Sequence, residues 1–196
     1  MSYPQISYLA DVNKQKAINQ ILKNDALRML NSYKALGGGF SADINYNVKL
    51  NNGKILSVAY SGYCNFKNAA HPSNLFFTTN INITNGARIK LIDLVNINDA
   101  FIKKVRAAKY VGPLEQSPEV NTAVNNSRKE FTNDQLIKMF KTADTPQSES
   151  FSYLTSDSLV VSIPMMHVIG DYGEFAVKYS DITSDIRTKN VVWKDI

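Results

Sequence analysis

The stretch FSADINYNVKLNNGKILSVAYSGYCNF, residues 40–66, decides the fold. Over residues 40–50, apolar side chains occupy every second position, which is the period of a β-strand with one buried face. The sequence NNGK at 51–54 supplies Asn and Gly, which tolerate the positive φ angles of a tight hairpin turn. Residues 55–66 are then expected to return as a second strand. The alternating residues, which we expect on one face, are Phe40, Ala42, Ile44, Tyr46, Val48 and Leu50.

A long helix is expected before this hairpin. Asp11 can cap its first turn, and apolar residues recur at spacings of three and four up to about residue 35. The glycines at 37–39 are expected to end the helix. Residues 2–9 precede it and are expected to form a strand. The apolar stripe of the helix consists of Ile18, Ile21, Leu22, Met29 and Leu30.

The rest of the chain separates its helices by runs of antiparallel strands. This order predicts an α+β fold, with antiparallel sheets and helices packed on one face. Residues 110–131 have no clear pattern and could be a long loop or hold short helices. The expected strands are 75–83, 89–91, 151–154, 158–163 and 174–179, and the expected helices are 98–109 and 132–141.

The composition is that of an ordinary globular protein. Of the 196 residues, 44% are hydrophobic and 20% are charged, and the net charge is +5. A solvated, lysine-rich surface explains this charge better than a polyanionic partner does. No apolar run reaches the roughly 20 residues that span a bilayer, and no signal peptide is visible, so we expect either a cytoplasmic protein or a trimmed precursor. Cys64 is the single cysteine, which excludes an internal disulfide.

The sequence lacks the motifs of common catalytic and metal sites. No spacing of His and Cys fits a zinc site, and there is neither a phosphate-binding loop nor a nucleophile elbow. We therefore predict no catalytic residue, no metal and no cofactor. Nucleic acid is not an expected partner, because basic residues do not alternate with aromatic ones on one face. The densest basic cluster consists of Lys103, Lys104, Arg106 and Lys109.

The two histidines raise separate questions. His71 precedes Pro72 in a polar loop, where it could act as the base for Ser73 in a hydrolase or could simply shape a corner. The sequence favours the second interpretation, because a histidine beside proline in such a loop more often stabilises a turn. His167, in PMMHVIG, is expected in a strand, where it would be partly buried.

Residues near turns are the best candidates for a binding surface. Tyrosine is enriched at protein interfaces, and three tyrosines, Tyr60, Tyr63 and Tyr172, lie close to turns or strand ends, although packing in a sheet explains each of them at least as well. The sequence GDYG at 170–173 predicts one of these turns. Together with the loop that holds the first histidine, they give the predicted binding residues, which are His71, Pro72, Ser73, Tyr63, Asp171 and Tyr172.

The order of several short motifs resembles a pair of bacterial extracytoplasmic domains of poorly known function. Residues 1–88 resemble the non-catalytic N-terminal region of PdaC-type peptidoglycan deacetylases, and 89–186 resemble the C-terminal part of the extracellular, lysozyme-sensing region of the anti-sigma factor RsiV. Residues 187–196 would be a tail. One departure is Asn68-Ala69-Ala70-His71, where the family often has Gly-Gly-Ala-His. The motifs are YPQI, INQIL, LSVAYSGYCNF, AAHPSN, TNGARIKLIDL, QLIKMF and FSYLTSDSLVVSIPMMHVIGDYGEFAVKYSDI.

This resemblance implies an exported domain pair, forming one compact unit, from a Gram-positive-type bacterium. A signal peptide or membrane anchor would lie outside this chain. The implied function is non-catalytic binding or sensing at the cell envelope, with a lysozyme-like protein or peptidoglycan as partner. Deacetylase activity is not implied, because the chain has no counterpart of the metal-binding catalytic domain. Two alternatives stay open: a cell-wall hydrolase that uses His71, and a structural spacer.

Overall fold

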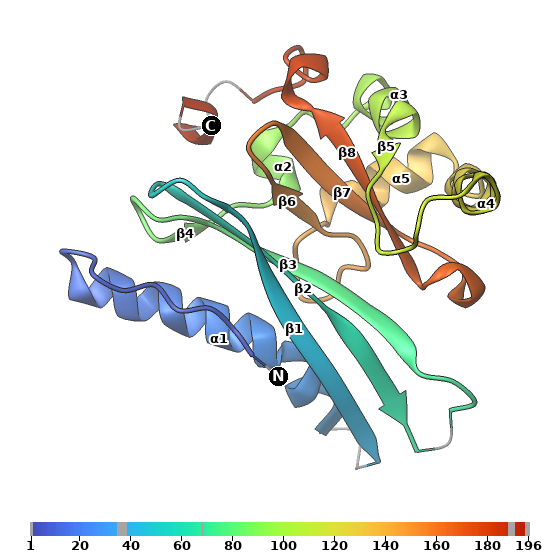
Figure 1. The fold of residues 1–196 in the computed structure, drawn as a ribbon. Helices are drawn as coiled ribbons and strands as arrows, with labels where there is room; N and C mark the ends of the chain where they lie inside the picture. The colour runs from blue at the N-terminus through green and yellow to red at the C-terminus, as the bar shows by residue number, and fades with distance from the viewer. Residues whose placement is uncertain (1, 35–38, 68, 188–190, 195–196) are drawn as a thin grey trace.

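The long hairpin forms the edge strand and its neighbour in the first of two antiparallel sheets (Figure 1). The structure, a computed structural model, describes residues 2–34, 39–67, 69–187 and 191–194. The hairpin prediction is confirmed, and Gly53 in its turn has a φ of 82°. The first sheet has the order β1-β2-β3-β4, with strands β1 (Phe40–Asn51), β2 (Ile55–Phe66), β3 (Ser73–Asn82) and β4 (Ala87–Arg88).

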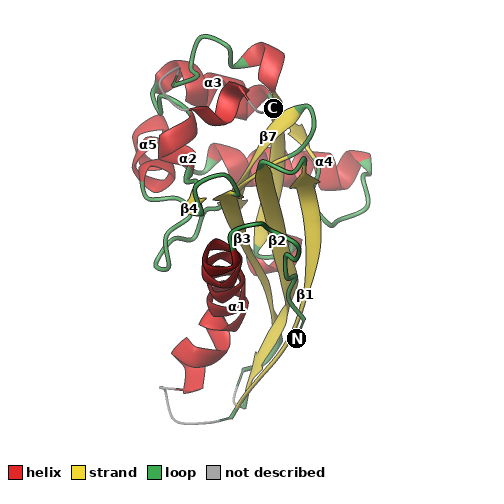
Figure 2. Ribbon diagram, turned by 90° about the vertical axis from the view of Figure 1, so that its left-hand side faces the viewer, coloured by secondary structure: helices red, strands yellow, loops and turns green. Residues whose placement is uncertain are grey.

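Helix α1 (Val12–Lys34) packs against one face of this sheet (Figure 2). The side chain of Asp11 caps it by accepting a hydrogen bond from the backbone N of Lys14 at 2.9 Å, as predicted. Ile18 and Leu22 of the predicted stripe are fully buried, together with Tyr60 and Phe77 of the sheet. The glycines expected to end the helix lie largely outside the described residues, which resume at residue 39.

The hairpin departs from the predicted alternation at one point. The register between β1 and β2 shifts between Val48, which pairs with Val58, and Leu50, which pairs with Ser57. Val58 and Ser57 point to opposite faces of β2, so Leu50 lies on the face opposite Val48. Leu50 accordingly packs against the core of the second sheet, and its predicted place in one apolar face is wrong.

The second sheet has the order β5-β8-β7-β6. Its core lies on the side covered by helices, where Leu159, Val161 and Phe175 meet Phe101 and Phe140 of the helices. The α+β prediction, with antiparallel sheets and helices, is therefore confirmed. The strands are β5 (Lys109–Tyr110), β6 (Ser152–Leu154), β7 (Ser158–Pro164) and β8 (Tyr172–Lys178), and the helices are α2 (Leu91–Leu94), α3 (Asp99–Ala107), α4 (Pro118–Lys129) and α5 (Asn133–Lys141).

Two local predictions need correction, and one open alternative is decided. Residues 2–9 form no strand, although Ser2 donates a backbone hydrogen bond to Ile44. The fourth strand is Ala87–Arg88 rather than 89–91, because α2 begins at Leu91 and its first backbone N–H is held by the Asp144 carboxylate. Of the two alternatives left open for 110–131, a helix is confirmed, because this stretch contains α4, which Ser117 caps.

Hydrogen bonds join the two sheets across the predicted boundary at residue 88. Ser57 of β2 accepts from the backbone N of Leu154 at 2.9 Å, and Asn80 of β3 donates to the carbonyl of Ser152 at 2.8 Å. The carboxylate of Asp144 adds a third link, because it accepts from the hydroxyl of Thr78 and from the backbone N of Ser152. The division at residue 88 stays a prediction.

Part of the predicted tail docks on the second sheet's helical side. Residues Val191–Lys194 form a short 3₁₀ helix, η3. The indole N–H of Trp193 donates to the carbonyl of Leu94 at 2.8 Å, and its ring meets Tyr179 edge-on at 5.5 Å. Among the described helices, none is both long and apolar enough to cross a membrane.

Candidate functional site

The loop before β3 and the turn before β8 meet at a small polar cluster, which we call the Asp171 corner (His71, Asn74, His167 and Asp171). One carboxylate oxygen of Asp171 accepts from the backbone N of Asn74 at 2.7 Å and from its side-chain amide at 3.2 Å. The other oxygen lies 2.9 Å from Nδ1 of His167. Both the Gly170 and Asp171 backbones are left-handed, with φ of 98° and 68°, which aims this carboxylate back at β3.

The histidines lie beside each other in this corner. The rings of His71 and His167 are stacked, with centroids 6.1 Å apart and planes inclined by 22°. The predicted strand at His167 is wrong. This residue lies in the 3₁₀ helix η1 (His167–Ile169), where it is exposed. Within the described residues, His71 has no hydrogen bond to Ser73 or Asp171. His71 and Ser73 are thus not joined by the hydrogen bond that links a base to its nucleophile, and the role of His71 stays a prediction.

The other predicted binding residues surround the corner. Tyr63 of β2 lies opposite Asn74 and is 52% exposed, whereas Ser73 lies opposite Cys64. Pro72 is exposed just before β3. Tyr172, the first residue of β8, is buried and stacks on Phe76 with ring centroids 4.7 Å apart. The structure therefore brings the six predicted residues into one region, in which Tyr172 serves packing.

Two exposed apolar residues next to the corner were missed by the sequence argument. Met166 is 51% exposed and Val168, within η1, is 83% exposed. Because they flank His167, whose ring stacks on that of His71, they add exposed apolar surface to the corner. The only signal in the sequence was the pair of large apolar residues flanking His167, which favoured a strand instead.

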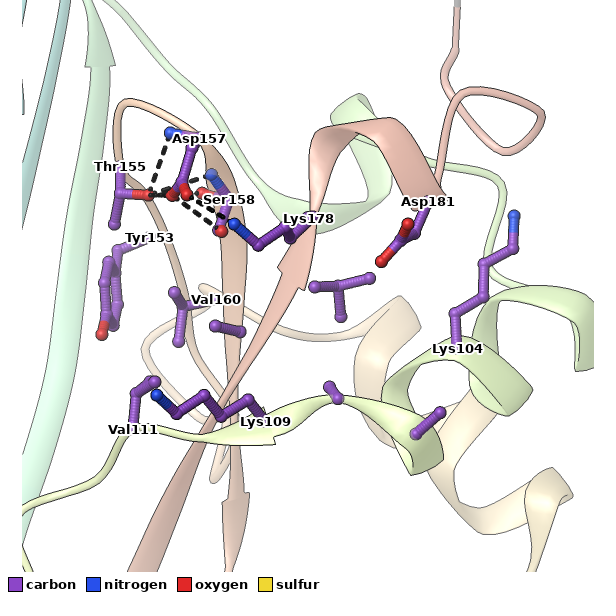
Figure 3. A pocket seen from close by; sticks show the side chains of 14 residues that line it. Lys104, Lys109, Val111, Tyr153, Thr155, Asp157, Ser158, Val160, Lys178 and Asp181 are labelled. Carbon is purple, nitrogen blue, oxygen red and sulfur yellow. Dashed lines mark hydrogen bonds and ion pairs between the residues drawn. The ribbon is translucent and has the colours of Figure 1, made fainter.

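A groove crosses the face of the second sheet that the helices leave open (Figure 3). Its volume is about 840 Å³, within the range of small-ligand sites. The register places Tyr153, Val160, Ala176 and Lys109 side by side across the four strands. Apolar residues from three strands thus form the floor. The charged residues of the groove are Lys104, Lys109, Asp157, Lys178 and Asp181.

Charges at the rim of the groove are only partly paired. Lys178 contacts Asp157 at 3.1 Å, and the hydroxyl of Ser158 also donates to Asp157, which together with Lys178 holds the pKa of that carboxyl below its usual value. Lys104 turns to Asp185 at 2.5 Å. Lys109 forms no hydrogen bond or ion pair with any residue described here, and it extends along the groove's edge (Figure 3).

The basic cluster in the sequence contributes to the groove through only two of its members. Lys104 and Lys109 line the groove. Arg106 instead donates to the carbonyls of Arg128 and Phe131, and so ties α3 to the end of α4. The cluster was a usable signal for the groove, but its arginine is structural.

A buried carboxyl lies one row from the groove on the same face of the sheet. Glu174 pairs with Ser162, next to the Val160 and Ala176 pair. Burial raises the pKa of Glu174, while Tyr153 and Lys49 lower it, and its Oε2 has no hydrogen-bond partner in the described structure. The ammonium of Lys49 lies 4.9 Å from the centroid of the Tyr153 ring. Burial thus favours the protonated form of Glu174 more than it would for an exposed glutamate.

Metal-binding and thiol chemistry find little support in the described residues. Across the described ranges, no group of three or more His, Cys, Asp and Glu side chains could hold a metal ion. Cys64 is buried, and this burial raises the pKa of its thiol, with a hydrogen bond from the Ser73 backbone acting in the opposite direction. A raised pKa makes a thiol a poorer nucleophile at neutral pH.

Comparison with known proteins identifies the fold. No family model matches the chain, and no curated protein matches it. A DUF3298 family protein from Pseudomonas aeruginosa PAO1 aligns with a TM-score of 0.56 and 16% identity, covering 89% of this chain and 80% of that one. A DUF3298 family member from Bacteroides fragilis NCTC 9343 aligns with a TM-score of 0.49 and 15% identity, covering 93% and 67%.

These structural neighbours belong to a family whose function is unknown, in agreement with the expectation of a poorly known domain. The more specific resemblance to PdaC-type deacetylases and RsiV stays a prediction. The chain shares the fold of a solved DUF3298 family protein.

Proposed function

We propose that this chain is a non-catalytic binding module that works outside the cytoplasm, at the bacterial cell envelope. The observation that carries the proposal is the groove of about 840 Å³ on the open face of the second sheet. An apolar floor with a few charged groups at the rim is typical of ligand sites. The location rests on the resemblance of the motif order to extracytoplasmic domains.

The residues of the groove support binding over catalysis. The described lining contains neither histidine nor cysteine. Its Ser158 hydroxyl donates to Asp157, and Asp157 is held by Lys178, so this serine has no base that would activate it. A hydrolase that used His71 would need a nucleophile and a carboxylate arranged around that ring, and the Asp171 carboxylate contacts His167 instead.

A wall polymer is the partner that the groove fits best. Peptidoglycan strands combine apolar ring faces and methyl groups with carboxylates. The floor formed by Val160 and Ala176 suits the former, and Lys109 can pair with a carboxylate. A membrane contact would come only from an anchor outside this chain, and nucleic acid is not part of the proposal.

A lysozyme-like protein is the second candidate, and a separate surface favours it. Exposed Tyr63, Met166 and Val168 lie around the Asp171 corner. Tyrosine and methionine are enriched at protein interfaces. Under this alternative, the corner rather than the groove contacts the partner.

Titration calorimetry against a peptidoglycan digest and against a C-type lysozyme would test these proposals. Lys109→Glu should weaken wall-fragment binding by about tenfold. Lys23→Glu makes the same charge change at an exposed position of α1 and should leave this binding unchanged. Val168→Asp should weaken lysozyme binding alone. No saturable binding of either ligand would overturn both candidates and leave the structural spacer. Binding of wall fragments that is indifferent to Lys109→Glu would remove the groove from the proposal.

A further inference from the structure

A second cavity lies apart from the groove, with which it shares no lining residue. Its volume is about 320 Å³. It is bounded by α1, by the edge of β3 that has no neighbouring strand, and by the segment that leads into β6. We call it the Arg28 cavity, and the lining residues that matter here are Arg28, Asn74, Phe77, Glu149, Phe151 and Asp171.

Arg28 is the only cation among the described residues that line this cavity. Its guanidinium carbon lies 5.0 Å from the centroid of the Phe77 ring and 5.3 Å from that of Phe151. These two rings fix the orientation of the planar guanidinium. It therefore loses little further conformational entropy when it binds a partner. The buried Nε donates to no acceptor within the described chain.

The carboxylates near Arg28 are engaged elsewhere. Asp25, one turn earlier in α1, accepts hydrogen bonds from Arg88 through both oxygens and from the hydroxyl of Thr79. Asp144 accepts from Ser152 through both of its oxygens. Neither forms a hydrogen bond or ion pair with Arg28 in the described structure. Burial lowers the pKa of Arg28, as expected for a desolvated charge that lacks a contacting anion.

The edge of β3 that borders the cavity already donates a backbone hydrogen bond to one carboxylate. Asn74 directs its backbone N–H away from β2, and Asp171 occupies that position as the missing strand partner would. Residues two apart point the same way along a strand, so Phe76 presents its backbone N–H and C=O to the same side. On the side of β3 that faces away from β2, the N–H and C=O of Phe76 form no backbone hydrogen bond with a described residue. Arg28 and an open strand edge thus border one cavity.

We propose that the Arg28 cavity binds the carboxylate of a ligand, with Arg28 as its charged contact. The planar guanidinium edge matches a carboxylate in a paired geometry. The carboxylate can belong to a small free acid or to an extended peptide. A peptide adds backbone hydrogen bonds to the edge of β3 at Phe76.

Glu149 weakens the binding of a carboxylate in this cavity. It is exposed on the cavity wall and forms no ion pair with a described residue. Its negative charge repels an incoming carboxylate, and its removal should strengthen binding without touching Arg28. Asp171, at the other end of the cavity, is screened by its hydrogen bonds with Asn74 and His167.

The test is an NMR titration of the full chain that follows the Nε–Hε signal of Arg28. The probes are acetate, inorganic phosphate and a short amidated peptide with a single aspartate, each compared with chloride at equal ionic strength. Saturable acetate binding should shift this signal downfield. Because Arg28→Met lacks this signal, its titration is followed through the backbone amides of Phe76 and Phe77, which also line the cavity. Acetate binding should be at least about tenfold weaker in Arg28→Met, and Lys23→Met on the same helix should leave acetate binding unchanged. Glu149→Gln should tighten it about two- to fivefold.

The outcomes separate the possible ligands. Tighter binding of the peptide than of acetate, with shifts at Phe76, identifies an extended peptide as the source of the carboxylate, whereas equal affinities identify a free acid. Phosphate binding without acetate binding would overturn the carboxylate assignment. No shift of Arg28 with any probe at tens of millimolar would overturn the site itself. If Arg28→Met does not fold, an unchanged affinity in Glu149→Gln would also count against the proposal.

Discussion

Asp171 accepts a hydrogen bond at 2.7 Å from the backbone N of Asn74, which lies 97 residues earlier in the chain. This carboxylate joins the turn that precedes β8 to the edge of β3 at Asn74. Because Asp171 also contacts His167, the contact fixes the loop and the turn that carry the two histidines.

Removal of this carboxylate should loosen the corner. Asp171→Ala leaves the Asn74 N–H without its acceptor and should lower the free energy of unfolding by about 2 kcal/mol. Asp171→Asn keeps one acceptor and tolerates the left-handed backbone, so it should cost less. Urea denaturation measures both. Asp157→Ala, which breaks the exposed contact with Lys178, serves as the control and should leave the midpoint unchanged.

The half-buried Asp144 should make stability depend on pH. Burial raises the pKa of Asp144 from 3.8 to about 6, against the opposing hydrogen bonds from Ser152 and Leu91. The unfolded chain loses this proton at lower pH than the folded chain does. The free energy of unfolding should therefore fall as pH rises from about 4 to about 6, by about 3 kcal/mol from this group.

Asp144→Asn isolates this contribution, because Glu174, whose pKa is also raised, acts in the same direction in both proteins. The variant should be less stable overall. The Asp144 carboxylate accepts from Leu91 and Ser152 with its two oxygens, whereas an amide has only one oxygen that can accept. Its stability should change less over this pH range than that of the wild type. Parallel pH profiles for the two proteins would contradict the assignment to Asp144.

Gly62 should tolerate no side chain. A Cβ added at Gly62 of β2 would lie 1.9 Å from the carbonyl oxygen of Asp43 on β1. Both atoms belong to paired backbones, so relief requires the strands to move apart. Gly62→Ala should cost about 3 kcal/mol, measured by chemical denaturation. The adjacent, exposed Ser61→Ala provides the control, and an equal effect of both substitutions would argue against the steric cause.

Trp193 should report the docking of the tail. Its indole donates to the Leu94 carbonyl, and Trp193→Phe keeps a ring against Tyr179 but removes this donor. The substitution should lower the free energy of unfolding by about 1 kcal/mol. As the single tryptophan of the chain, Trp193 should also shift its fluorescence to longer wavelength in the same urea transition that unfolds the sheets. A separate, earlier fluorescence transition would show that the tail undocks independently.

Local patterns predicted much of the secondary structure. The hairpin around NNGK, α1, α3 and α5 were recognisable because period, caps and turns agree within each segment. Helix α4 was left as one of two alternatives for 110–131, even though Ser117, Pro118 and Glu119 form a usable start signal. The strand expected at 89–91 failed because a distant carboxylate, Asp144, stabilises the start of α2 instead.

The site was less accessible to sequence reasoning. His71 and Asp171 were both selected as turn residues, but no local pattern indicates that they would meet. The His167 segment was taken for a strand because its apolar neighbours are usually buried, whereas Val168 is 83% exposed. The groove depends on the register of four short strands, which only the tertiary structure fixes.

The extra residue in β1 divides the hairpin between two hydrophobic cores. Before the register shift, Ala42 and Ile44 contribute to the core under α1, and after it Leu50 packs against the core of the other sheet. Between them, Lys49 reaches Tyr153. Deletion of this one residue would restore regular pairing and exchange the inward and outward sides of the hairpin's end. In this segment the number of residues therefore matters more than their identity: conservative replacements should be tolerated, and a change in length should not.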